Sequence, residues 1–264
     1  MIIKPGFFQK KLRSLTLTVF NRLENNNNAV FETNGEKHFI DNLFGYLNKT
    51  VQGKKILFDV GANIGTYSLM LLNQNREIEN VEIHVFEPTT ACFKLLQDRF
   101  AHTVNVILNK KAVSDSVGSA EIYFDEQKSS LASLYKRNLS AYSTHMDQSE
   151  IVETIRLENY FADHQIGHVH FLKIDIEGHE MAAFTGMGNY LNSEFVDFIQ
   201  FEYGGANLDS HTSLMELYAL LETAGFVITK IMPRGLEVRP YHPWMDNFQY
   251  ANYVAVSSTI LTSL

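Results

Sequence analysis

The chain of 264 residues lacks the features of several protein classes. It holds one cysteine, Cys92, which excludes an internal disulfide framework and a cysteine-rich metal site. No apolar run approaches the roughly 20 residues that span a bilayer. Its 22 Lys and Arg are outnumbered by 30 Asp and Glu, and the net charge of −8 argues against a protein that mainly binds nucleic acid. We therefore expect a soluble, cytoplasmic protein.

The chain is long enough for one α/β domain with an extension, and its 45% of hydrophobic residues is ordinary for a globular protein. We expect a domain at 29–264, preceded at 1–28 by a basic helix and an asparagine-rich linker. The helix has no acid before Glu24 and apolar residues at helical spacing between residues 8 and 20. Such a helix can lie on a membrane surface, but more often it packs on its own domain or on a second subunit.

The residues at 54–72 organise the predicted domain. Ile56 to Val60 is a short, mostly apolar run, typical of a strand that is buried on both faces of a parallel sheet. Gly61 and Gly65 bracket a tight turn, and Thr66 to Leu72 has the apolar residues of a buried helix. Strand, turn and helix form the first half of a nucleotide-binding βαβ unit, in which glycine lets the backbone approach a ligand.

An acid in this motif distinguishes between nucleotides. A dinucleotide fold seats its pyrophosphate on the helix N-terminus with the pattern G-x-G-x-x-G. Here Asn63 replaces the middle glycine, and Asp59 stands two residues before Gly61. A carboxylate near the strand end would repel a pyrophosphate, but it suits a ligand with an ammonium and a sulfonium group. S-adenosylmethionine (SAM) is such a ligand, so the sequence predicts SAM rather than NAD as the cofactor.

A second acid follows the next predicted strand, Val81 to Phe86. Glu87 lies 22 residues after Gly65, close to the offset of about 20 residues at which an acid meets ribose hydroxyls. A carboxylate can accept from both hydroxyls at once, which favours ribose binding. Glu87 can also cap the helix predicted from Thr89 to Phe100, and the two roles are compatible.

A loop and an insert follow the third predicted strand, Val104 to Leu108. The loop holds Ala112 and Val113, small residues that leave room for an adenine ring; an ordinary connection is the alternative. Strands expected at 118–125 and 151–157 enclose a polar, serine-rich insert at 126–150, which is too long for a plain connection. The insert is either a mobile lid over the substrate or a disordered surface loop.

Further strands expected at 170–174, 195–201, 226–231 and 253–256 alternate with helices. This order predicts an open, mostly parallel sheet with helices on both faces, in which ligands bind outside the carboxyl ends of the strands. Five acids fall at or just past predicted strand ends: Asp59, Glu87, Asp175, Glu177 and Glu202. Repulsion among them requires a cationic ligand, a metal or shared protons; alternatively, two or three of them cap helices.

Three motifs together resemble the FkbM family of SAM-dependent methyltransferases: Asp-Val-Gly-Ala-Asn-Ile-Gly (59–65), Phe-Glu-Pro (86–88) and Leu-Lys-Ile-Asp-Ile-Glu-Gly-His-Glu (172–180). The resemblance runs from about residue 54 to residue 186. It implies a Rossmann-like class I methyltransferase fold, with a mostly parallel seven-stranded sheet and an antiparallel last strand. It also implies methyl transfer to a hydroxyl of a sugar or secondary metabolite. The matching SAM-binding positions are Asp59, Gly61, Asn63, Gly65 and Glu87.

An acceptor hydroxyl has to lose its proton, so a base within hydrogen-bond reach helps. His179 is the candidate, with Asp175 or Glu177 expected to hold its tautomer; a solvent-facing histidine at a helix start is the alternative. Lys173 is expected to pair with one of the acids. Asp175, Glu177 and Glu202 have oxygen ligands that suit Mg²⁺, but no metal-specific spacing appears and we predict no metal.

The expected partner is a small-molecule or glycan acceptor. Four residues near the C-terminus either line its pocket or pack a loop: His211, Tyr241, His242 and Trp244. Two other functions are compatible with a nucleotide-binding fold. An NAD-dependent oxidoreductase is disfavoured by Asp59 and Asn63, and a non-catalytic SAM-fold binding module is disfavoured by the intact set of acids at the strand ends.

Overall fold

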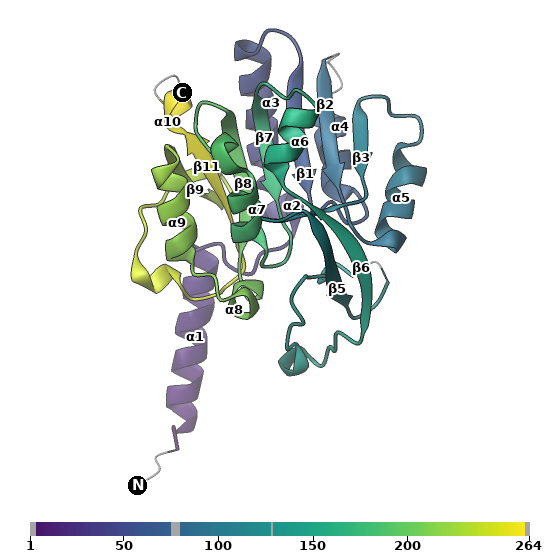
Figure 1. The fold of residues 1–264 in the computed structure, drawn as a ribbon. Helices are drawn as coiled ribbons and strands as arrows, with labels where there is room; N and C mark the ends of the chain where they lie inside the picture. The colour runs from purple at the N-terminus through teal and green to yellow at the C-terminus, as the bar shows by residue number, and fades with distance from the viewer. Residues whose placement is uncertain (1–3, 75–79, 128, 262–264) are drawn as a thin grey trace.

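A mostly parallel sheet forms the centre of the computed structural model, which describes residues 4–74, 80–127 and 129–261 (Figure 1). Within these residues the sheet has eight strands in the order β10-β9-β11-β8-β7-β1-β2-β3. The strands are β1 (Lys55–Val60), β2 (Val81–Phe86), β3 (Val106–Asn109), β7 (Val169–Ile174), β8 (Val196–Tyr203), β9 (Phe226–Met232), β10 (Gly235–Val238) and β11 (Ala251–Ser257).

The strand directions confirm the predicted Rossmann-like fold. Strands β3, β2, β1, β7 and β8 pair in parallel, and β11 runs antiparallel between β8 and β9. The sheet has one strand more than the seven expected. After β9 the chain turns at Pro233 and Arg234, and β10 returns antiparallel along the edge, with Gly235 opposite Met232.

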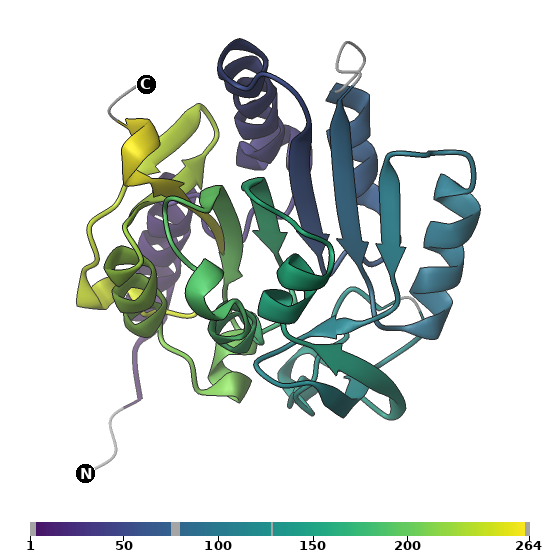
Figure 2. The same cartoon turned by 45° about the horizontal axis from the view of Figure 1, so that its top comes forward.

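Helices cover both faces of the sheet (Figure 2). Successive residues of a strand point to opposite faces, so Leu57 joins one buried cluster and Phe58 the other. The first cluster is closed by α3 (Glu36–Thr50), α4 (Thr66–Gln74), α5 (Thr90–Phe100) and α10 (Ser258–Leu261). The second is closed by α6 (Leu157–Asp163), α7 (Glu180–Gly186) and α9 (Leu214–Thr223). Burial on both sides explains why these strands read as continuous apolar runs.

A second, smaller sheet stands at the carboxyl ends of the main strands (Figure 1). It has the order β4-β6-β5, with β4 (Ala112–Val113), β5 (Gly118–Phe124) and β6 (Gln148–Ile155). The two strands expected around the serine-rich insert are therefore present and pair antiparallel with each other. Short elements complete the chain: α2 (Phe31–Asn34), α8 (Ala206–Ser210), and the 3₁₀ turns Ser140–Tyr142, Gly188–Tyr190 and Pro243–Met245.

The asparagine tract at 25–28 differs from the linker that its composition predicted. Asn25 and Asn26 are buried. Asn25 Nδ2 donates to the carbonyl oxygens of Asn34 (2.7 Å) and Ile231 (3.0 Å), and Lys230 Nζ donates to Asn26 Oδ1 (2.8 Å). The tract is thus fixed to β9, because short amide side chains can satisfy backbone groups that would otherwise stay unpaired.

The helix before the tract, α1 (Phe7–Leu23), extends away from the domain (Figure 1). None of its residues is buried, so the expected packing on its own domain is not seen. It contacts the domain near its C-terminal end, where the ring of Phe20 meets that of Trp244 edge-on at 5.7 Å. Among the described residues, no helix has the length and apolarity to cross a membrane.

Candidate active site

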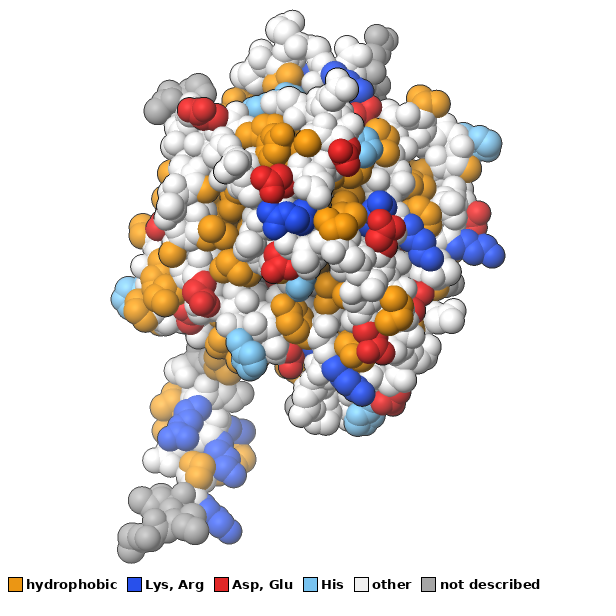
Figure 3. Space-filling model, in the orientation of Figure 1, with side chains coloured by type: hydrophobic (Ala, Val, Ile, Leu, Met, Phe, Trp, Pro, Cys, Tyr) orange, Lys and Arg blue, Asp and Glu red, His pale blue; other side chains and the backbone are white. Residues whose placement is uncertain are grey.

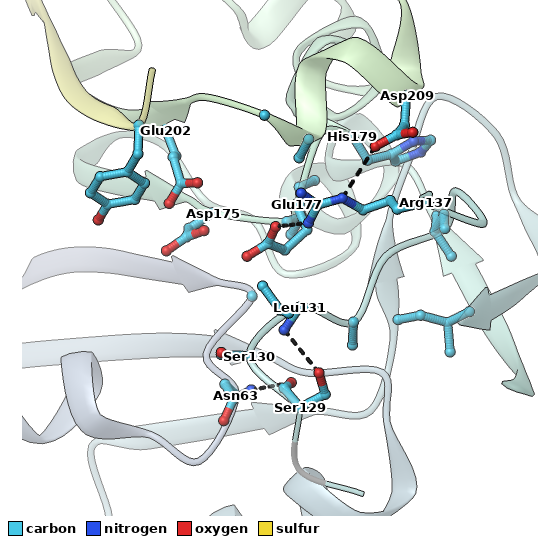
Figure 4. Close-up of a pocket in the computed structure, with 18 of the residues that line it drawn as sticks. Asn63, Ser129, Ser130, Leu131, Arg137, Asp175, Glu177, His179, Glu202 and Asp209 are labelled. Carbon is cyan, nitrogen blue, oxygen red and sulfur yellow. Dashed lines mark hydrogen bonds and ion pairs between the residues drawn. The ribbon is translucent and has the colours of Figure 1, made fainter. Parts of the chain in front are cut away.

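A cavity of about 910 Å³ lies at the carboxyl ends of the parallel strands, where the main sheet meets the small one (Figure 4). This is the place where doubly wound sheets bind ligands. Most of the predicted site residues line it: Gly61, Asn63, Glu87, Ala112, Val113, Asp175, Glu177 and His179. Asp59 and Gly65 do not line this cavity.

The Asp59 side chain contacts other residues of the chain and does not reach the cavity. Its side chain is fully buried, and its Oδ2 accepts a hydrogen bond from Ser68 Oγ (2.5 Å). Lys173 is its register partner on the neighbouring strand β7, with Nζ 3.9 Å from Asp59 Oδ1. Burial raises the pKa of Asp59, and Lys173 opposes that rise. The structure therefore places the Asp59 carboxylate against a cation of the chain, and not in the cavity where a charged ligand would meet it.

The two motif glycines allow parts of the fold to approach each other closely. Gly61 has φ +85°, and a Cβ there would lie 1.8 Å from the carbonyl oxygen of Asp175. Gly65 has φ +80°, and its Cβ would meet the side chain of Leu96 at 2.6 Å. Both positions need glycine for their left-handed backbone as well as for space. Gly61 brings the ends of β1 and β7 together at the cavity, while Gly65 lets α5 pack on the turn.

Glu87 links the glycine turn to the next helix. Its Oε2 accepts from the backbone N–H of Asn63 (2.9 Å), and its Oε1 accepts from the N–H (2.8 Å) and hydroxyl (2.5 Å) of Thr89. The helix-capping role expected of Glu87 is not seen, because Thr89 is the N-cap residue of α5 and the N–H of Thr90 donates to Glu150 Oε1 (2.7 Å). Burial raises the pKa of Glu87, although the bonds from Thr89 oppose the rise. Glu87 also lines the cavity, and its ribose role stays a prediction.

Three carboxylates gather on the opposite wall (Figure 4). Oxygens of Asp175, Glu177 and Glu202 all lie within 4.8 Å of one another. Burial and then the charge of Asp175 raise the pKa of Glu177 to about 8, although Arg137 opposes the rise. Burial, followed by the charges of Asp175 and Glu177, also raises the pKa of Glu202. Both shifts are in the direction expected for carboxylates that are buried close together.

Two of these carboxylates already have cationic partners. Lys173 Nζ donates to Asp175 Oδ2 (2.9 Å), which confirms the predicted pairing of Lys173 with an acid. Arg137 Nη1 donates to Glu177 Oε2 (2.5 Å). Three oxygen ligands at this spacing resemble a divalent cation site, but such an ion would compete with both side chains.

His179 begins α7 as its N-cap residue and lines the cavity. Its Nδ1 lies 3.1 Å from the hydroxyl of Tyr135, and its Nε2 lies 2.9 Å from Ser114 Oγ. Two hydroxyls therefore hold the ring where a carboxylate was predicted, because Asp175 and Glu177 are engaged by Lys173 and Arg137. Burial lowers the pKa of His179, so the ring is neutral at pH 7.

The serine-rich insert at 126–150 forms a wall of the cavity rather than a disordered surface loop, as far as its described residues show. Its Ser129 accepts from Asn63 Nδ2 through the carbonyl oxygen (2.8 Å), and Ser133 Oγ donates to the carbonyl oxygen of Glu177 (2.7 Å). Arg137, whose side chain is only 8% exposed, bridges Glu177 and Asp209 of α8 (Figure 4).

Sequence reasoning missed these residues of the insert, Arg137 above all. The segment has no periodic pattern, so nothing indicated which of its side chains would turn inward. The signal in the sequence was the positive charge of Arg137, because the acids predicted at the strand ends could pair with a cation from the insert. The four candidates near the C-terminus do not line the cavity that the described residues form: His211, Tyr241, His242 and Trp244. Tyr241 packs the loop, where its hydroxyl donates to Asp246 Oδ2 (2.6 Å), and the other three are exposed.

Comparisons with known proteins identify the family of this chain. The model of the methyltransferase FkbM domain matches residues 59–228. The 31-O-demethyl-FK506 methyltransferase FkbM of Streptomyces tacrolimicus is 28% identical over 198 residues, which cover 66% of this chain and 73% of that relative. The hexuronic acid methyltransferase AglP of Haloferax volcanii is 24% identical over 164 residues, 61% of each chain.

Among solved structures, methyltransferase FkbM from Methylobacillus flagellatus KT is 15% identical with a TM-score of 0.49. That alignment covers 82% of this chain and 48% of the other. The family match alone spans more than half of the chain, from the glycine turn to strand β9. We conclude that this protein belongs to the methyltransferase FkbM family.

Proposed function

We propose that this methyltransferase moves a methyl group from SAM to a hydroxyl of a sugar or secondary metabolite. The observation that carries the proposal is the cavity inside the family domain, with its wall of carboxylates at the carboxyl ends of the strands. The names of both relatives support the acceptor class. One acts on an O-demethyl form of FK506, and the other on a hexuronic acid.

The residues that line the cavity fit SAM. A volume of about 910 Å³ lies within the range of pockets that bury small ligands. Glu87 would accept from the ribose hydroxyls, Ala112 and Val113 would lie beside the adenine, and Asp175 and Glu202 would face the ammonium group. When bound, SAM supplies a methyl group that its positively charged sulfur has already activated. The same carboxylates would repel the pyrophosphate of NAD.

The cations near the cavity support the same choice of cofactor. Arg137 and Lys111 are the basic side chains that line it among the described residues. Arg137 is held by Glu177 and Asp209, and Lys111 pairs with Glu153 at 2.7 Å. Neither is free to neutralise a phosphate without breaking an ion pair. The charge balance therefore favours a cationic ligand without phosphates.

The chain has two tasks in this reaction, orientation and proton removal. The cavity walls fix the acceptor hydroxyl in line with the methyl group, and such alignment supplies much of the rate. We assign the proton to His179, whose ring is neutral at pH 7 because burial lowers its pKa. Ser114 and Tyr135 hold the ring in the cavity wall. Asp175 and Glu177 are the next acceptors in reach of the same space.

The test is transfer of a labelled methyl group by the full chain. The protein is incubated with SAM tritiated on its methyl group and with a panel of hexuronic acids, glycans that contain them, and hydroxylated macrolides. We expect label in at least one acceptor, and mass spectrometry and NMR should locate the methyl group on oxygen. The matched control is the same acceptor with its hydroxyls already methylated, which should take no label. Label on carbon or nitrogen, or turnover that depends on NAD, would contradict the proposal.

A further inference from the structure

Helix α1 carries an apolar stripe that no other part of the described chain covers. Its residues at positions 8, 12, 15, 19 and 23 recur at intervals of three and four, which places them on one side of a helix. All five are exposed, between 49% for Val19 and 76% for Phe8: Phe8, Leu12, Leu15, Val19 and Leu23. Figure 3 shows the hydrophobic side chains of this helix standing clear of the domain.

The same helix is the basic part of an acidic protein. Five of the basic residues lie between Lys4 and Arg22, and no acid precedes Glu24. The remaining 17 basic and 30 acidic residues give the rest of the chain a formal net charge of −13. Lys11 and Arg22 flank the apolar stripe on the helix surface, where long basic side chains reach past apolar ones to a charged surface. Lys10 and Arg13 lie on the opposite side.

The base of α1 lies near the cavity. Phe20 packs against Trp244, which is itself 43% exposed, and Asn21 lies within hydrogen-bond distance of Gln249 (3.5 Å). Gln249 lines the cavity, as does Asn27 a few residues after the helix. In Figure 1 the helix leaves the domain at the same end as the small sheet. The C-terminal end of α1 therefore lies beside the rim of the cavity.

A second copy of the chain fits this stripe less well than a lipid surface. The helix has 17 residues, fewer than the three to four heptads typical of a coiled coil. Two copies would also bring like charges together, because the residues from 4 to 23 provide no acid to pair with Lys10, Lys11 or Arg13. Anionic lipids supply both an apolar layer and the opposite charge.

We propose that α1 binds anionic membranes in the plane of the interface, with the stripe of Phe8, Leu12, Leu15, Val19 and Leu23 in the acyl boundary. Lys10, Lys11, Arg13 and Arg22 then lie among the lipid headgroups. A short amphipathic helix with basic flanks and large apolar side chains has the composition of interfacial anchors. Each basic residue near an anionic leaflet contributes about 1 kcal/mol. This membrane contact is independent of the methyl acceptor.

The test is co-sedimentation of the full chain with phospholipid vesicles. We expect binding to mixed phosphatidylcholine and phosphatidylserine vesicles, little binding to phosphatidylcholine alone, and release at high salt. A Leu12→Ser/Leu15→Ser variant should lose binding. Leu17→Ser is the matched control, because Leu17 is 54% exposed on the opposite side of the helix and should leave binding unchanged. Lys10→Ala with Lys11→Ala should weaken binding about 30-fold.

Circular dichroism should show that the serine variants fold, since α1 buries no side chain. Three results would overturn the proposal: no binding to the mixed vesicles, equal binding to both kinds of vesicle, or equal losses in the Leu17 and Leu12/Leu15 variants. Analytical ultracentrifugation adds a fourth. A dimer that becomes a monomer in Leu12→Ser/Leu15→Ser would assign the stripe to a second copy of the chain.

Discussion

Replacing Glu202 by glutamine should stabilise the protein at alkaline pH and have little effect at acid pH. Its carboxylate lies within 4.8 Å of those of Asp175 and Glu177, and burial and these two charges raise its pKa. Asp175 and Glu177 have Lys173 and Arg137 as partners, whereas no ion pair within 4.0 Å involves Glu202 among the described residues. Glu202→Gln therefore removes repulsion and leaves no cation unpaired.

The size of the effect follows from this spacing. Two unit charges 4.8 Å apart repel by about 3 kcal/mol at an effective dielectric constant near 20. The folded pKa values of Glu177 and Glu202 are raised above the ordinary 4.5. The free energy of folding that these groups contribute is fully present below pH 4.5, the ordinary pKa of a glutamate in the unfolded chain. It is lost as the pH rises through the folded pKa, which is about 8 for Glu177. Relief of the repulsion should thus appear at about pH 9 and fade by about pH 5.

The assay is thermal unfolding of the wild type and the variant across this pH range. For a chain of this length, about 3 kcal/mol corresponds to a rise in Tm of roughly 6–12 °C at alkaline pH. Glu222→Gln, which changes an exposed carboxylate far from the cluster in sequence, is the control and should follow the wild type. An equal Tm for Glu202→Gln and the wild type at every pH, or a lower one at alkaline pH, would refute this account of the cluster.

Three further outcomes follow from the site. His179→Ala should lower turnover by roughly 10²–10⁴-fold with little change in SAM affinity, and the wild-type rate should rise with pH to an inflection below 6.5, because burial lowers the pKa of His179. Unchanged turnover would make that residue structural. Activity should persist in excess EDTA, since cations of the chain already pair with two of the three clustered carboxylates; loss that Mg²⁺ restores would contradict this. Gly61→Ala should destabilise the fold by more than 1 kcal/mol, because its Cβ would lie 1.8 Å from the Asp175 carbonyl oxygen; an unchanged urea midpoint would argue against the close approach.

The central strands, and a cavity at their carboxyl ends, were predictable from the sequence. Burial on both faces produces apolar runs such as Ile56 to Val60, and the glycine turn marks where the chain leaves the sheet. Strand β10 was missed because four residues, Gly235–Val238, are too few to show an alternating pattern. The asparagine-rich composition also predicted a linker at Asn25 wrongly, because the side-chain amide of Asn25 donates to the backbone of β9.

The partners of individual side chains were less predictable, because they depend on register and on loops. Asp59 stands at a strand end in the sequence, but its register partner across β1 and β7 is Lys173, which is distant in the chain. Neither residue alone indicates that pairing. Arg137 lies in an insert without periodicity, yet it pairs with Glu177, and Tyr135 of the same insert contacts His179. Pairings of this kind require the three-dimensional arrangement of the strands and the insert.

Calorimetric titration with SAM and with NAD tests the central claim most directly. The wild-type chain should bind SAM and not NAD, since carboxylates line the cavity and its cations are paired. Glu87→Gln should weaken SAM binding by about 1–3 kcal/mol, the cost of lost hydrogen bonds to a charged acceptor, while Glu222→Gln binds as the wild type does. A wild-type chain that binds NAD but not SAM, or a folded Glu87→Gln variant with unchanged SAM affinity, would contradict the account.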